Sequence, residues 1–342
     1  MGSKKSTKRD FDWRSYSRPS RLLNGEQVDE LTCGRLSPLL SLARSDGELS
    51  LQLRASQLAV YSRGVSLVRV RRTDAGLIGE VDANLRLPHA ERAGAERLES
   101  WPLDTADDVA RLLATVDELR ADLDHWRAQG EPIPARAWLL DFAAANAGAA
   151  PMLDELVVVD VEYPYGRRKF DFVGVRRTPF VGGAGAFAMP RLVLGDLRYP
   201  GRAVGGSAQP AEFGSDAAEL SHALSGEHLA HVRDEVGALL RQKQGLGLLP
   251  AEVPFERVSE GYPELVVVFE DADVADARFD APIADLHDKL VTRRFPTEHL
   301  RFANVGLARE GAESTDASKL TVREGDVLDY RAFKGMRRRR RC

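Results

Sequence analysis

Residues 155–199 decide the fold; they begin ELVVVDVEYPYGRRKFDFVGVRR and end RLVLGDLRY. This stretch contains three short apolar runs rich in β-branched residues, at 157–161, 170–175 and 192–197, and turn residues bound each run. Runs of this kind predict β-strands, and their close succession predicts a meander of neighbouring strands.

Acidic residues interrupt all three runs: Asp160 and Glu162 in the first, Asp171 in the second and Asp196 in the third. A carboxylate inside a strand is costly to bury unless it is paired, protonated or bound to a metal. Carboxylate oxygens suit Mg²⁺ or Mn²⁺, and Mg²⁺ takes only one or two of them when phosphates complete its shell. We therefore predict a metal site of Asp171 and Asp196 with Glu162 as a third ligand. Asp160 is interpreted as an ion-pair partner or an outward-facing residue.

Helical patterns flank the predicted strands. Residues 105–127 carry acidic side chains in the first turn and apolar residues at helical spacing, and 135–149 form a second predicted helix. A long helix is predicted after the strands, over about 216–244, either continuous or broken near Ser225 and Gly226. It is followed by a predicted strand at 263–270, a helix at 284–291 and a strand at 300–307. Strands followed by alternating helices indicate an α/β domain with a mixed sheet.

The N-terminal part has a different pattern. Residues 24–44 predict a short helix interrupted at Gly34 and Pro38, and residues 48–87 alternate apolar and polar side chains. This alternation predicts three or four antiparallel strands with short connections. The predicted organisation is as follows: a basic disordered tail at 1–22, a β-rich N-terminal domain at 23–100, an α/β domain with its leading helices at 101–310, and a linker with an Arg-rich tail at 311–342.

Composition excludes several classes of protein. No apolar run approaches the roughly 20 residues that span a bilayer, and the N-terminus lacks the apolar segment of a secretory signal. Cys33 and Cys342 are the only cysteines, which is too few for a disulfide framework or a Cys-rich zinc site. We therefore expect a cytoplasmic protein that does not bind membranes.

Charge is unevenly distributed along the chain. The net charge is −4, which argues against a general nucleic-acid coat, yet both ends are basic. Seven Lys and Arg residues lie within positions 1–21, and Arg337 to Arg341 form an uninterrupted run. These ends are either solubilising disordered tails or a non-specific hold on phosphates.

The order helix, three strands, helix, strand, with Asp171 on the second strand and Asp196-Leu-Arg198 on the third, resembles the PD-(D/E)XK nuclease superfamily. In that superfamily the second strand supplies an Asp and the third an acid–x–Lys. Further segments resemble a bacterial group of its members, so the resemblance extends over most of residues 48–310. These segments are DVEY at 160–163, FDF at 170–172, LGDLRY at 194–199 and HVRD at 231–234.

The resemblance implies a restriction-endonuclease-like core and a Mg²⁺- or Mn²⁺-dependent endonuclease acting on DNA in bacterial defence or repair, alone or within a larger protein complex. Asp171, Asp196 and Glu162 would be the metal ligands, and Arg198 would lie beside the scissile phosphate. The family's Lys is Arg198 here, and Arg cannot give up a proton whereas a buried Lys can. The second hypothesis is therefore a nuclease-like protein that no longer cuts but binds nucleic acid or a protein partner.

The other motifs in the sequence are weaker indications of function. His228 and His231 are three residues apart and share a helix face, which suits a zinc pair or a hydrogen-bonded helix histidine. No third ligand with suitable spacing appears, so the second interpretation is favoured. The glycine-rich segments lack the strand–loop–helix context of a nucleotide site, and neither a Walker motif nor a nucleophile elbow is present.

Overall fold

The fold was analysed in a computed structural model, which describes most but not all of the chain. The described residues are 21–54, 57–62, 64–87, 97–129, 135–147, 155–165, 168–176, 189–198, 226–250, 255, 257–270, 280–292, 295–305, 322 and 326–341. Most of the predicted N-terminal tail, the glycine-rich segments at 182–185 and 201–206 and the first part of the helix predicted at 216–244 lie outside these ranges.

The N-terminal part folds as an antiparallel sheet in the strand order β1-β2-β3-β4-β5. Its strands are β1 (Leu49–Arg54), β2 (Gln57–Ser62), β3 (Val65–Thr73), β4 (Gly76–Asp82) and β5 (Leu98–Pro102). The predicted antiparallel strands are confirmed, and β5 adds a strand that the sequence did not indicate. Thr73 pairs with Gly76 where β3 turns into β4, and Gly76 has a φ of 128°, which glycine adopts without steric cost.

Three helices pack with this sheet: α1 (Gly25–Thr32), α2 (Ser37–Ser45) and α3 (Ala106–Ala128), and a 3-10 turn, η2 (Ala83–Arg86), follows β4. Thr105 caps α3 through a capping box with Asp108. The apolar stripe of α3, including Leu112 and Val116, lies in one core with Leu67 and Val70 of β3. Helix α3 therefore belongs to the N-terminal unit rather than to the α/β domain in which we had predicted it.

The second sheet is mixed, with the strand order β11-β10-β9-β8-β7-β6. Its strands are β6 (Leu156–Tyr165), β7 (Arg168–Arg176), β8 (Arg191–Arg198), β9 (Glu264–Glu270), β10 (Leu300–Val305) and β11 (Leu328–Asp329). Strands β6, β7 and β8 form the predicted antiparallel meander, and β8, β9 and β10 run parallel to one another. The α/β class with a mixed sheet is thus confirmed.

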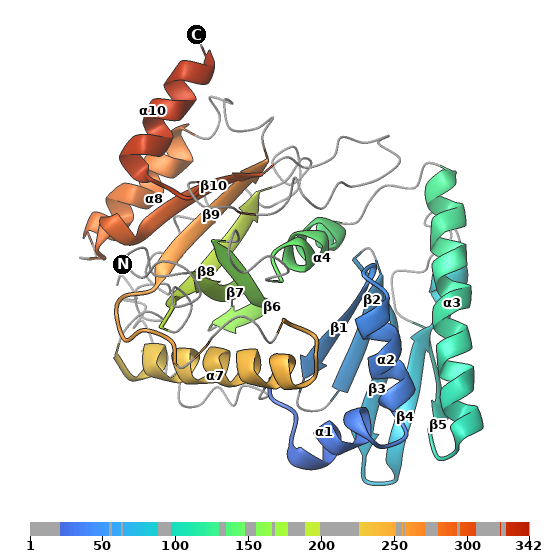
Figure 1. The fold of residues 1–342 in the computed structure, drawn as a ribbon. Helices are drawn as coiled ribbons and strands as arrows, with labels where there is room; N and C mark the ends of the chain where they lie inside the picture. Colours follow the sequence, from blue (N-terminus) through green and yellow to red (C-terminus); the bar gives the residue numbers. More distant parts are fainter. Residues whose placement is uncertain are drawn as a thin grey trace, which may run out of the picture.

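Helices cover both faces of the mixed sheet (Figure 1). On one face, α4 (Ala135–Ala145) packs Phe142 against Phe172 and Leu197. On the other face, α7 (Gly226–Gly245) packs Val236 in the same core as Val173 of β7. Two more helices contribute to this second core, α8 (Asp280–Thr292) and α10 (Tyr330–Arg341), and a short 3-10 turn, η6 (Thr297–His299), precedes β10.

The described parts of the two segments that we predicted to be tails are packed against the fold. Arg21 is buried and bonded to β6, and residues 330–341 form helix α10. Phe333 of α10 is buried and stacks on Phe302 with ring centroids 4.4 Å apart. The aromatic anchor inside the cationic segment is the physical reason why this part of the chain is not a solvated tail.

Candidate active site

The feature that singles out Asp171 and Asp196 is the place where β7 and β8 stop pairing. Their ladder runs from Arg176–Arg191 to Phe172–Gly195 and ends there. Strand β7 continues its pairing with β6, and β8 continues its pairing with β9. Asp171 and Asp196 are the next residues on the two strands. We call this place the β7–β8 fork, and it carries one carboxylate on each strand.

Alternation from their apolar neighbours assigns both carboxylates to the face of the sheet that α7 covers. Asp171 is two residues from Val173 and Asp196 is two from Leu194, and both of those apolar side chains lie in the core beneath α7. Asp171 is buried and Asp196 is half-buried. The opposite face is filled instead by Phe172, whose ring lies 2.0 Å from the place that a Cβ on Gly195 would take.

Asp171 is oriented by the backbone of the neighbouring strand. Its Oδ2 accepts the Leu197 N–H at 2.9 Å, a backbone donor that the β7–β8 ladder no longer reaches. This bond compensates part of the cost of burying a carboxylate. A carboxylate has about four acceptor positions, so one N–H bond is compatible with binding a cation as well.

Glu162 lies at a change of backbone direction in β6. Its φ is 51°, a left-handed backbone conformation that residues other than glycine rarely adopt. Val161 before it packs on the α4 side, whereas Tyr163 after it packs on the α7 side. The Glu162 side chain is ion-paired with Lys169 of β7. Sequence reasoning did not include Lys169 in the site, although it is two residues from Asp171 on one strand.

Asp160 is confirmed as an ion-pair partner. It is 2% exposed, is bonded to Arg21, and accepts Arg54 Nη1 at 3.1 Å. Burial opposes the charged form, but the positive charges of Arg54, Arg21 and Lys243 hold the pKa of Asp160 below its usual value. Asp160 is therefore engaged in joining β6 to β1 and to the chain before α1, and is not available at the fork.

Lys243 completes this buried cluster. Its Nζ donates to the Val159 carbonyl at 2.7 Å. Burial lowers the pKa of Lys243 from 10.5 to about 8, and the positive charges of Arg54 and Arg21 act in the same direction while Asp160 opposes them. Its partners come from segments far away in the chain, which is why no local pattern indicated it.

The remaining predicted residues are less closely defined. Arg198 is the last residue of β8, and only its backbone is described. On α7, His228 is buried and His231 is exposed. Among the described residues, no group of three His, Cys, Asp or Glu side chains is placed to hold a metal by itself. A cation at the fork would thus take two protein carboxylates and complete its shell from water and phosphate.

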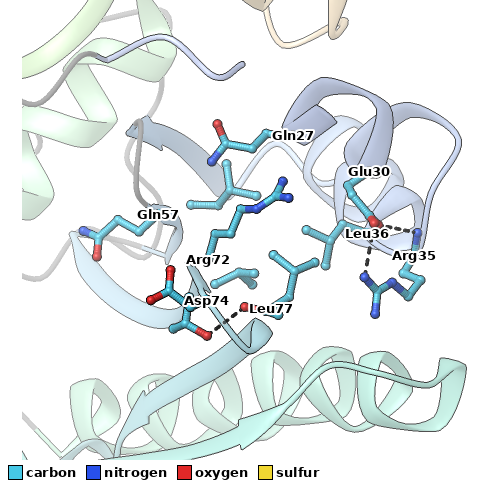
Figure 2. Close-up of a pocket in the computed structure, with 12 residues that line it drawn as sticks. Gln27, Glu30, Arg35, Leu36, Gln57, Arg72, Asp74 and Leu77 are labelled. Atoms are coloured by element: carbon cyan, nitrogen blue, oxygen red, sulfur yellow. Dashed lines mark hydrogen bonds and ion pairs between the residues drawn. The ribbon is translucent and has the colours of Figure 1, made fainter. Parts of the chain in front are cut away.

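A separate hollow of about 160 Å³ lies in the N-terminal unit, between α1 and strands β2 to β4 (Figure 2). Its floor is apolar, with Leu36, Leu58, Val70 and Leu77, and its rim includes Arg35 and Arg72. Arg35 is paired with Glu30 at 3.2 Å and Arg72 with Glu26 at 2.7 Å. Because both guanidinium groups already have carboxylate partners, the hollow offers no surplus positive charge for a phosphate.

The chain was compared with protein-family models, with curated proteins and with solved structures. No family model, no curated protein and no solved structure matches the chain. Within the described residues, no helix is both long and apolar enough to cross a membrane.

Proposed function

We propose that this protein hydrolyses phosphodiester bonds in DNA with the help of Mg²⁺ or Mn²⁺, at the β7–β8 fork. The observation that carries the proposal is the placement of Asp171 and Asp196 on neighbouring strands, on one face, where strand pairing ends. Carboxylates at a break in a buried sheet are costly and have no packing role, which is typical of functional sites.

The order of elements supports the same proposal. Helix α4, strands β6 to β8, helix α7 and strand β9 follow one another as helix, three strands, helix, strand. The second of these strands carries Asp171 and the third carries Asp196-Leu-Arg198. This is the order expected of a restriction-endonuclease-like core in the PD-(D/E)XK superfamily, and we propose that the mixed sheet is such a core.

The donor set at the fork fits a hard divalent cation. Asp171 and Asp196 would hold it, and water and phosphate would complete its shell, because Glu162 is ion-paired with Lys169. When bound, the cation would supply positive charge for the phosphate and make a water easier to deprotonate. The Leu197 N–H holds Asp171 in place before any ligand arrives, so this carboxylate needs little reorganisation.

Arg198 has a defined part in this proposal. Alternation along β8 puts it on the same face as Asp196. Its guanidinium stays protonated at accessible pH, so it cannot take a proton from the attacking water. It can bind two phosphate oxygens at once, which orients the phosphodiester beside the carboxylates. We place this activity in the bacterial cytoplasm, in defence against foreign DNA or in repair.

A second function is favoured by two specific observations. The third-strand motif ends in Arg rather than Lys, and Oδ2 of Asp171 already accepts a backbone N–H. Both suit a nuclease-like protein that holds DNA, or a protein partner, without cutting.

Cleavage of supercoiled plasmid decides between the two functions. We expect nicking that requires Mg²⁺ or Mn²⁺, and a loss of about 100-fold or more in Asp171→Asn and Asp196→Asn, because small changes at a reacting centre cost this much. Asp117→Asn, at an exposed position of α3, is the matched control and should cut like the wild type. Cleavage that persists in both fork variants, or a wild type that never cuts, would refute the nuclease proposal.

A further inference from the structure

Helix α10 is the most strongly charged element of the described chain. Its sequence, YRAFKGMRRRRR, contains seven Lys and Arg residues and no Asp or Glu over its 12 residues. Cations at a helix C-terminus interact well with the helix dipole, but like charges three and four residues apart repel one another. A partner with dense negative charge would relieve that repulsion.

Two side chains fix α10 to the mixed sheet. The ring of Phe333 stacks on Phe302 and, at 5.4 Å, on Phe269 of β9. Arg337 is 3% exposed, donates to Asp280 of α8 at 3.0 Å and stacks over Phe333 at 5.6 Å. A tail that only increases solubility would need no such anchors, so the position of the charge is itself specified.

These anchors connect α10 to the strand beside β8. Phe269 is the ladder partner of Arg198, and Val267 is the ladder partner of Asp196. Phe269, Val267 and Phe333 share the core on the face that α7 covers. Figure 1 shows α10 beside β10 and α8, at the edge of the sheet away from the N-terminal unit. Helix α10 thus packs on β10 and reaches, through Phe333, the strand next to β8, on the same face of the sheet as α7.

The outward side of α10 keeps its cations available. Arg331 and Lys334 are exposed, and their spacing of three residues puts them on one side of the helix. DNA carries one negative charge per about 1.7 Å of duplex axis, so a pair of cations of this kind can contact its backbone.

We propose that α10 binds the sugar–phosphate backbone of DNA and holds the duplex beside the β7–β8 fork. This inference names the surface that holds the DNA for the proposed nuclease site and rests on the proposed function for what happens there. The binding itself is measurable without any cleavage.

The test compares two double variants of the full chain, each of which removes two positive charges. R331Q/K334Q changes the two exposed cations of α10. R97Q/R257Q changes exposed arginines elsewhere, with Arg257 near the opposite end of β8 because Ser259 N–H bonds to the Pro190 carbonyl. Binding to a fluorescent 30-base-pair duplex is measured by anisotropy between 50 and 200 mM salt, in EDTA. Thermal melting confirms that both variants remain folded.

We expect R331Q/K334Q to bind more weakly and to lower the slope of log affinity against log salt by about 1.8, since each lost phosphate contact removes about 0.9. R97Q/R257Q should match the wild type. An unchanged slope in R331Q/K334Q, an equal loss in the control, or a wild type that does not bind the duplex would overturn the inference, the last result pointing to an acidic protein partner.

The two proposals fail separately. Binding that depends on α10, together with a wild type that never cuts in Mg²⁺ or Mn²⁺, removes the nuclease but keeps the α10 surface. Metal-dependent cutting with equal binding by both double variants removes the α10 surface but keeps the nuclease.

Discussion

The ion cluster around Asp160 and Lys243 is where we expect a substitution of one residue to change the stability of the fold most. One carboxylate lies among three cationic side chains, from β1, from α7 and from the residue before Leu22. Removing one partner of a buried ion pair leaves an uncompensated charge, which costs more than the pair contributes. The cluster should therefore respond strongly both to substitution and to pH.

Asp160→Asn is expected to lower the free energy of unfolding by about 3–5 kcal/mol, because the buried Arg21 and Lys243 and the half-buried Arg54 would lose their counter-charge. Urea unfolding followed by circular dichroism measures this change. Asp117→Asn is the control for the loss of one negative charge and should stay within about 0.5 kcal/mol of the wild type. An Asp160 variant as stable as this control would contradict the role of the cluster.

The pH dependence of stability follows from Lys243. Its pKa is about 8 in the fold and 10.5 in the unfolded chain. Between these values the unfolded chain binds more protons, so the free energy of unfolding contributed by Lys243 increases as pH rises from about 8 to 10.5. Lys243→Met should flatten this part of the curve relative to the wild type. A wild type and a variant with parallel curves across that range would show that Lys243 is not perturbed by burial.

At the scale of elements, the packing of β8 against β7 depends on one missing side chain. Phe172 fills the α4 face directly over Gly195, and its ring is fully buried beside Phe142 at 5.1 Å. The same residues end the β7–β8 ladder, so the filled face and the fork occupy opposite sides of one position. Glycine at 195 is what allows the two strands to stay close there.

Gly195→Ala is expected to cost about 1–3 kcal/mol, because the new Cβ would overlap the Phe172 ring and the surrounding core would have to shift. Gly245→Ala is the matched control, since nothing lies within 4 Å of a Cβ there and its φ is not positive. Thermal melting of both variants checks the difference. Equal melting temperatures would mean that the Phe172 ring moves without cost.

For the whole molecule, the sequence predicted elements better than it predicted which elements contact one another. The apolar runs of β6, β7 and β8 are local patterns, and the cost of burying Asp160 correctly predicted an ion pair. Its partners Arg21 and Arg54 could not be found this way, because they are 139 and 106 residues away. Helix α3 was assigned to the wrong unit since an apolar stripe does not say which sheet it meets. In α10, the arginine run concealed the pattern of Phe333 and its neighbours.

The two sheets are joined by more than the Asp160 cluster. Leu246, just after α7, is 1% exposed within the core of the N-terminal unit, and Arg44 of α2 donates to its carbonyl at 2.7 Å. In Figure 1, α7 ends beside β1. We therefore expect both units of the wild type to unfold in one transition. With Trp13 and Trp138 replaced by Phe, because Trp138 of α4 lies in the core of the mixed sheet, Trp101 and Trp126 report on the N-terminal unit by fluorescence, and circular dichroism reports on both.

Leu246→Ala should separate the two transitions. Loss of a buried leucine costs about 2–5 kcal/mol, and here the cavity would open in the N-terminal core although the residue follows a helix of the mixed sheet. The tryptophan signal should then change at lower urea than circular dichroism does. Val291→Ala, at an exposed position of α8, is the control and should keep the transitions together. Because the fork and α10 both belong to the mixed sheet, DNA binding by Leu246→Ala should persist at urea concentrations where the N-terminal unit has already unfolded. Loss of binding together with the tryptophan signal would show instead that the N-terminal unit is needed to hold the duplex.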